Sequence, residues 1–390
     1  KGASPAEDAG LMGWRRLLGN EYVPVPVEVN QMIKVGTAKS LLDVPYKFPK
    51  TDDTQRESWS AAYIQFEDFG MPLGLGGLAV AFKAIRDTDD VHHSVWQTIA
   101  LIAACIHCLM LLALMYKAVR YPTKIYNDMM NPMKRHALSA VILCNLLFAY
   151  LMEGFDWKFQ HFIWWTAAPA ALVHLVFMLY VWIKNRHSSE HINPGMIFPV
   201  ATCLFASIVG HTMVDFGEAA QWFFGIGFLF FIITLVATFS HGITYHWSDD
   251  RMRPMVALWM GGCFIIQLAF QTISGEPLQA GEPFDLFSMT FFASGCILFV
   301  VCVLLAYPGR WLLRGRFEMS NWALAFPLDI FALSASQYRL VYGHTFSKFV
   351  LYMALVFAVW ANFTMLCHTL TNLFGRRWPR PPQKWGPLRF

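Results

Sequence analysis

The spacing of Cys105-Ile106-His107-Cys108 is that of a metal or redox site, in which two thiols are separated by two residues. Histidines in apolar segments offer a second chemistry, since two imidazoles on facing helices can hold a haem iron. Neither pattern is complete, because no second cysteine pair stands at zinc-ligand distance and nothing fixes which histidines would pair. We therefore expect packing and hydrogen bonds between helices, with no metal and no other cofactor. The histidines concerned are His174, His211, His241 and His368.

Residues arranged for catalysis are missing from the rest of the sequence. No nucleophile has a nearby base. The glycines of the segment that begins near residue 69 imitate the G-x-G-x-x-G pattern of a dinucleotide site only loosely, and no strand precedes them. We expect that the protein is not an enzyme.

The composition is typical of a chain that lies in lipid. Of its 390 residues, 56% are hydrophobic and 14% are charged, with 34 Phe and 15 Trp, and the mean hydropathy is +0.41. Soluble proteins carry about 25% charged residues. These values exclude an ordinary soluble enzyme and indicate a multi-pass membrane protein. The net charge of +4 is small and gives no reason to expect nucleic acid as a partner.

Ten segments are long and apolar enough to cross a bilayer, which needs about 20 residues per helix. The basic residues of the loops gather after the even-numbered segments and in the C-terminal tail, whereas loops after several odd-numbered segments are acidic. Because basic loops stay on the cytoplasmic side, both termini are expected on the same inner side. The predicted segments are 69–87, 95–117, 136–153, 161–183, 195–213, 218–245, 255–273, 284–306, 317–338 and 345–374.

Short outer loops join these segments in pairs, so the sequence predicts an all-α membrane domain of five helical hairpins. Five hairpins can close into a ring, with one helix of each pair facing a central pore and the other facing lipid. Pro72, Pro199 and Pro327 interrupt odd-numbered segments. Broken backbone inside a membrane is tolerated where it is buried in protein or lines a water-filled cavity. The same prolines can equally be packing kinks.

The chain divides into three parts. Residues 1–65 form an extended, non-globular N-terminal segment, residues 66–375 a ten-helix transmembrane domain, and residues 376–390 a basic C-terminal tail. The N-terminal segment includes the run VPVPV, which prefers extended conformations. We expect this segment to contact either its own helices or a partner in a membrane complex.

Two motifs carry a resemblance to a known family. Residues 69–78, FGMPLGLGGL, resemble the opening helix of the tellurite-resistance/dicarboxylate transporter (TDT) family, which includes the bacterial protein TehA, the fungal malate permease and the slow anion channels of plant guard cells. Residues 317–328, FEMSNWALAFPL, are similar to the F-x-x-x-x-W-x-x-x-F-P pattern of its ninth helix. Phe198-Pro199 in the fifth segment is a weaker match.

The resemblance implies a pore lined by the odd-numbered helices, in a protein that commonly assembles as a homotrimer. It also implies a gate, because a phenylalanine of the ninth helix closes the pore in that family, and the matching residue is Phe326. An apolar constriction of this kind stops ions by dewetting. The alternative is that Phe326 packs against lipid or a neighbouring helix. The other residues expected to line the pore or break its helices are Gly70, Pro72, Gly74, Gly77, Phe198, Pro199, Trp322 and Pro327.

These features predict an anion channel or an anion/C4-dicarboxylate transporter, with small inorganic anions or malate as substrates. No Lys or Arg is central in any segment. Helix dipoles and a basic inner mouth would therefore attract anions weakly, as conduction requires. The membrane is expected to be the plasma membrane or that of an organelle, such as the mitochondrial inner membrane.

Asp329 does not fit this function, since it lies one helical turn beyond Phe326 and would repel an anion on the same face. It can pair with another helix, carry a proton for coupled transport, or indicate a pore that no longer conducts. The last reading supports an alternative function, a non-conducting structural subunit held in a larger membrane complex by residues 1–65. A membrane electron-transfer protein that uses the histidines is a third hypothesis.

Overall fold

The computed structural model describes nine stretches of the chain, and these stretches contain helices and no strand. The predicted C-terminal tail and all but the last two residues of the predicted N-terminal segment lie outside them. The described residues are 64–86, 92–131, 134–152, 157–184, 192–214, 216–244, 254–274, 284–309 and 319–374.

Each of the ten predicted segments corresponds to one long helix within the described residues. An additional short helix, α5, covers Pro122–Met130. The long helices are α3 (Gly70–Arg86), α4 (His93–Arg120), α6 (Leu138–Leu151), α7 (Trp157–Lys184), α8 (Ile197–Val214), α9 (Gly217–Thr244), α10 (Ala257–Ser274), α11 (Leu286–Gly309), α13 (Ala325–Tyr342) and α14 (Thr345–Phe374).

Eight of these helices are long and apolar enough to cross a membrane, counted over the described stretches. Helix α6 is apolar but short, forming with the turn before it the stretch Arg135–Leu151. Helix α13 contains Asp329, Arg339 and several hydroxyl and amide side chains, which lower its hydropathy. By length and composition, the described residues therefore contain eight candidate membrane spans.

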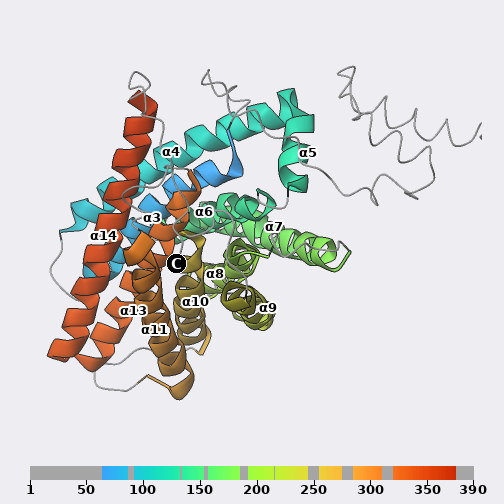
Figure 1. Ribbon diagram of the computed structural model, residues 1–390. Coiled ribbons are helices and arrows are strands. Elements are labelled where there is room, and N and C mark those ends of the chain that lie inside the picture. The colour runs from blue at the N-terminus through green and yellow to red at the C-terminus, as the bar shows by residue number, and fades with distance from the viewer. Residues whose placement is uncertain are drawn as a thin grey trace, which may run out of the picture.

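Five helices form a closed inner ring. Helix α3 packs against α6, α6 against α8, α8 against α10, α10 against α13, and α13 returns to α3. The other five long helices lie outside, each against the inner helix that precedes it in the chain: α4 on α3, α7 on α6, α9 on α8, α11 on α10 and α14 on α13. Figure 1 shows α4, α7, α9 and α14 at the periphery of the domain.

Burial separates the two layers. In the most apolar 18-residue stretch of α3, α8 and α10, between 67% and 89% of the residues are buried. In the corresponding stretches of α4, α7, α9, α11 and α14, the buried share is between 11% and 39%. The outer helices therefore expose many large apolar side chains, such as Leu101, Val173 and Phe363. A solvent of lipid tolerates this surface, which water would not.

The inner helices start in a common way. A 3-10 turn precedes α3, α6, α8 and α13, and residues 254–256 form such a turn before α10. The turns are η3 (Phe66–Phe69), η4 (Arg135–Ala137), η6 (Pro194–Met196) and η8 (Met319–Leu324). Because η3 contacts both η4 and η8, and η4 contacts η6, the turns gather at one end of the ring. The inner helices thus run parallel from that end.

Pro72, Pro199 and Pro327 each occupy the third position of an inner helix, shortly after its 3-10 turn. A proline in the first turn costs no α-helical hydrogen bond, because the N–H there has no partner within the helix. Its ring would clash with the carbonyl four residues earlier, so the preceding residues cannot continue as α-helix. The predicted breaks in these helices thus take the form of a change from 3-10 to α-helix.

A buried ion pair fixes the elbow between α4 and α5. The Nζ of Lys117 donates to Asp128 Oδ2 at 2.6 Å and to the Ile64 carbonyl at 2.5 Å, and the Lys117 side chain is 3% exposed. Asp128→Ala is expected to lower the free energy of unfolding by about 3 kcal/mol, because it leaves a buried ammonium without its counter-ion. Thermal unfolding in detergent measures this loss. Lys134→Ala, which removes a more exposed ammonium 3.6 Å from the same carboxylate, should change stability by about 0.5 kcal/mol or less, and equal effects of the two variants would contradict the assignment.

Candidate pore site

Two aromatic rings meet across the inside of the inner ring of helices. Phe326 of α13 and Phe205 of α8 lie with ring centroids 6.3 Å apart in an edge-to-face arrangement. Helices α13 and α8 are not neighbours in the ring, since α10 stands between them on one side and α3 and α6 on the other. The two side chains are 2% and 1% exposed. Side chains of two non-neighbouring helices therefore meet inside the ring at this level.

A third aromatic ring lies beside the contact between Phe205 and Phe326. Tyr150 of α6 lies with its ring centroid 6.4 Å from that of Phe205. The Nζ of Lys83, near the end of α3, stands 5.1 Å from the Tyr150 centroid and 5.6 Å from that of Trp96. A fixed positive charge thus lies beside the aromatic cluster formed by Tyr150, Phe205 and Phe326. Sequence reasoning missed Phe205, Tyr150 and Lys83, although Lys83 is a lone lysine in an apolar segment.

The glycines of α3 permit a close approach to α13. A Cβ added at Gly77 would lie 2.8 Å from Asp329 Oδ2 and 3.1 Å from Phe326 Cδ2, and one at Gly74 would lie 2.9 Å from Trp322 Cε3. Any larger residue at Gly77 would push against the two α13 side chains directly. Gly70, the first residue of α3, has an ordinary right-handed helical conformation. The role that the structure gives to Gly74 and Gly77 is therefore close packing within a continuous helix.

Trp322 and Asp329 form hydrogen bonds to the outer helix α14. The indole Nε1 of Trp322 donates to Thr369 Oγ1 at 3.0 Å, and Asn362 Nδ2 donates to Asp329 Oδ1 at 2.8 Å. Both partners belong to the outer helix α14. Asp329 thus pairs with another helix, one of the alternatives that the sequence left open.

The remaining predicted residues lie in the first turns of α8 and α13. Phe198 and Pro199 are buried at the start of α8, where the Phe198 carbonyl accepts a hydrogen bond from Thr202 Oγ1 at 2.8 Å. Pro327 packs on α10, since a Cβ added at Gly261 would lie 2.8 Å from Pro327 Cβ. Among these predicted residues, Phe326 has a ring contact with a non-neighbouring helix of the ring.

The C-x-x-C motif is split between two faces of α4. Cys105 and Cys108 are exposed on its outer side, whereas His107 is buried. The Nε2 of His107 lies 3.1 Å from Asn145 Oδ1 of α6, and its ring stacks on Phe148. In the part of the chain that the structure describes, no group of three or more His, Cys, Asp or Glu side chains could hold a metal ion. His107 thus connects α4 to α6.

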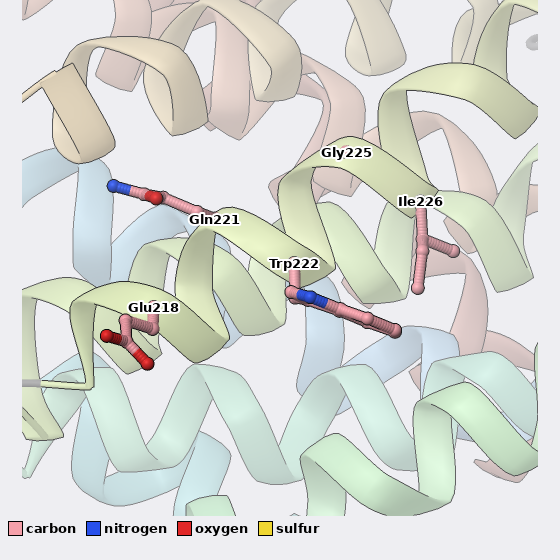
Figure 2. Close-up of a pocket in the computed structure, with 5 residues that line it drawn as sticks. All are labelled: Glu218, Gln221, Trp222, Gly225 and Ile226. Carbon is pink, nitrogen blue, oxygen red and sulfur yellow. The ribbon is translucent and has the colours of Figure 1, made fainter.

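A shallow pocket lies outside the ring of helices. Figure 2 shows that all the residues that line it come from one helix, α9. Trp222 is 73% exposed there. Because a single outer helix supplies the whole lining, this pocket is a groove on the outer surface and is separate from the aromatic cluster. The lining residues are Glu218, Gln221, Trp222, Gly225 and Ile226.

The chain is similar in sequence to known transporters and to an anion channel. An uncharacterised transporter of Methanocaldococcus jannaschii is 23% identical over 248 residues, which cover 58% of this chain and 70% of that protein. A tellurite resistance protein TehA homologue of Haemophilus influenzae is 20% identical over 272 residues, covering 69% and 80%. The S-type anion channel SLAH3 of Arabidopsis thaliana is 20% identical over 319 residues, covering 79% of this chain and 48% of its own length.

The family model named SLAC1, voltage-dependent anion channel, matches residues 63–372. This range includes every long helix of the two layers except the last residues of α14. The resemblance predicted from residues 69–78 and 317–328 is thereby confirmed. The chain belongs to the SLAC1 voltage-dependent anion channel family.

Proposed function

We propose that the protein is an anion channel whose pore runs inside the ring of α3, α6, α8, α10 and α13 and is closed by Phe326 against Phe205. The contact between these two rings carries the proposal, because it joins helices on opposite sides of the ring. A closed apolar constriction of this kind blocks ions without a charged latch. Rotation of Phe326 away from Phe205 opens the path.

The direction of the inner helices supports anions as the permeant species. All five start at the same end of the ring, and the N-terminal end of each α-helix carries roughly half a positive charge. This mouth therefore attracts anions with partial charges, while Lys83 adds a full charge near the other end of α3. We propose small inorganic anions or C4-dicarboxylates such as malate as substrates.

The proposed topology has ten membrane spans in five hairpins, with both termini on the inner side. Helices α6 and α13, which fall short of the length or hydropathy of a lone span, stand in the inner ring and pack against other helices. Helix α13 does not need apolar residues all round, because protein rather than lipid surrounds it. We further propose a homotrimer, as the family resemblance implies, with one pore in each protomer.

Planar-bilayer recording tests this function. The Phe205→Ala/Phe326→Ala double variant, which removes both rings of the constriction, is placed between two concentrations of potassium chloride. We expect a current whose reversal potential approaches the equilibrium potential of chloride. A reversal potential near that of potassium, or a well-folded double variant without any current, would reject the proposal, and the second result would favour the non-conducting subunit. Replacing chloride with nitrate or malate ranks the substrates.

A further inference from the structure

Asp329 and Asn362 form a buried hydrogen-bonded pair that has more acceptor atoms than donors. Asp329 is 0% exposed and Asn362 is 2% exposed. The Asn362 amide uses its N–H groups on Asp329 Oδ1 at 2.8 Å and on the Ala358 carbonyl at 3.1 Å. Two oxygens, Asp329 Oδ2 and Asn362 Oδ1, have no hydrogen-bond donor among the described residues. Two buried acceptors without a donor are costly, and each calls for a physical explanation.

The described surroundings of the pair supply no donor to these two oxygens. Helix α3 covers both oxygens with glycine: a Cβ at Gly77 would lie 2.8 Å from Asp329 Oδ2, and one at Gly74 would lie 3.0 Å from Asn362 Oδ1. The nearby Trp322 indole has already donated to Thr369. The amide and carboxyl oxygens therefore face a close-packed seam of α3, α13 and α14.

A carboxylate at this place would have no positive charge to compensate it within the described part of the chain, because Asp329 forms no ion pair there. No hydrogen bond or ion pair found among the described residues joins Asp329 to the titratable side chains of the three helices around it. They are Lys83 and Arg86 on α3, Tyr338, Arg339 and Tyr342 on α13, and Lys348, Tyr352, Cys367 and His368 on α14. An ionised carboxylate buried in this way would be strongly destabilising.

We infer that Asp329 binds a proton in the folded protein and closes a cyclic acid–amide pair with Asn362. In this pair the Asn362 amide N–H donates to Asp329 Oδ1, and the hydroxyl formed at Asp329 Oδ2 donates to Asn362 Oδ1. One proton, taken from water, thus satisfies both orphan oxygens and removes the charge. The acid that would have opposed an anion pore is neutral in this state.

The proton also links the pair to the aromatic cluster. Asp329 follows Phe326 by one helical turn, and both side chains press on Gly77. With the proton bound, the pair ties α13 to α14 and holds Phe326 in place. Release of the proton to water leaves a carboxylate against an amide oxygen, which separates α13 from α14. This gating role rests on the proposed channel function, whereas the bound proton does not.

Infrared spectroscopy of the full chain in lipid nanodiscs tests the proton directly. At neutral pH, subtracting the spectrum of Asp329→Asn from that of the wild type should leave the carbonyl band of a protonated carboxyl group, and this band should shift in D2O. The substituted amide keeps the shape of the pair and can donate to Asn362 Oδ1, so the variant is expected to fold. Carboxylate bands in the difference spectrum, with no carboxyl band, would overturn the inference.

Stability against pH gives a second test that does not depend on transport. The bound proton stabilises the folded state, so the wild-type melting temperature in detergent should fall as the pH is raised, while that of Asp329→Asn should fall less. Asn362→Leu, which deletes the amide, should be less stable than either protein. Equal pH dependence in the wild type and Asp329→Asn would contradict the acid–amide pair. A carboxyl band with a current that does not rise at alkaline pH would reject the gating role alone.

Discussion

Replacing Phe326 with alanine is expected to raise the anion current of the protein by about tenfold or more, which corresponds to a barrier lowered by about 1.4 kcal/mol. In the proposed pore, Phe326 and Phe205 close the interior from opposite sides of the ring, and their centroids lie 6.3 Å apart. Removing one ring opens a gap that water and ions can enter, since the constriction has no charged part that would remain. The measurement is current through oocyte membranes or proteoliposomes, normalised to the amount of protein at the surface.

Phe331→Ala is the matched control for this change. Phe331 lies on the same helix and is equally buried, but it stacks on Phe264 of α10 at 4.6 Å and contacts Phe299 of α11 at 5.1 Å. Its loss leaves a cavity on the outer side of α13, with a cost of about 3–5 kcal/mol in stability. The current should stay near that of the wild type. If both variants conduct alike, or if Phe326→Ala stays closed while fully folded, Phe326 is not the gate.

A second large effect is expected from Gly262→Val, which should lower the free energy of unfolding by about 3 kcal/mol. A Cβ added at Gly262 would lie 2.0 Å from Phe231 Cε2 and 2.7 Å from its Cζ. Phe231 is fully buried between α9 and α10, so its ring cannot move without separating an outer helix from the inner ring. Thermal unfolding in detergent, followed by size-exclusion chromatography, measures the loss.

Gly225→Val controls for the helix preference of the new side chain. Gly225 lies on the exposed side of α9, where an added Cβ would meet nothing within 4 Å. The change there should be about 0.5 kcal/mol or less. Phe231→Leu in the Gly262→Val background should restore part of the stability, because it removes the clashing atoms. If the two glycine variants lost similar stability, or if the double variant recovered none, the clash with Phe231 would not be the cause of the loss.

The helices were predictable because long apolar runs have few other stable forms in lipid. Each predicted segment contains most of one observed helix, and the FGMPLGLGGL motif falls on the glycine face that packs against α13. Pro72, Pro199 and Pro327 lie near the start of their α-helices, where the 3-10 turn ends. Pro327 lies at the third position of α13 because a proline is tolerated before the first α-helical hydrogen bond.

The partners of Phe326 could not be predicted from the sequence. Phe205 is one of 34 phenylalanines, and which of them face the interior depends on how the helices of the ring are rotated against one another. Asp329 shows that a small difference in angle around a helix decides what a side chain contacts. Three residues along an α-helix turn the side chain to about 60° from the starting direction. That difference separates the interior, where Phe326 lies, from the seam with α14, where Asp329 binds Asn362.

The 3-10 turns before the inner helices couple the rotation of each helix about its own axis to its position along that axis. A 3-10 helix rises about 2.0 Å and rotates about 120° per residue, against about 1.5 Å and 100° in an α-helix. Rewinding the six residues of η8 as α-helix would shorten the turn by about 3 Å and rotate α13 by about 120° on its own axis. Pro327 opposes this rewinding, because its ring would meet the carbonyl four residues earlier. The winding of one short turn therefore sets which side chain of α13 faces the axis.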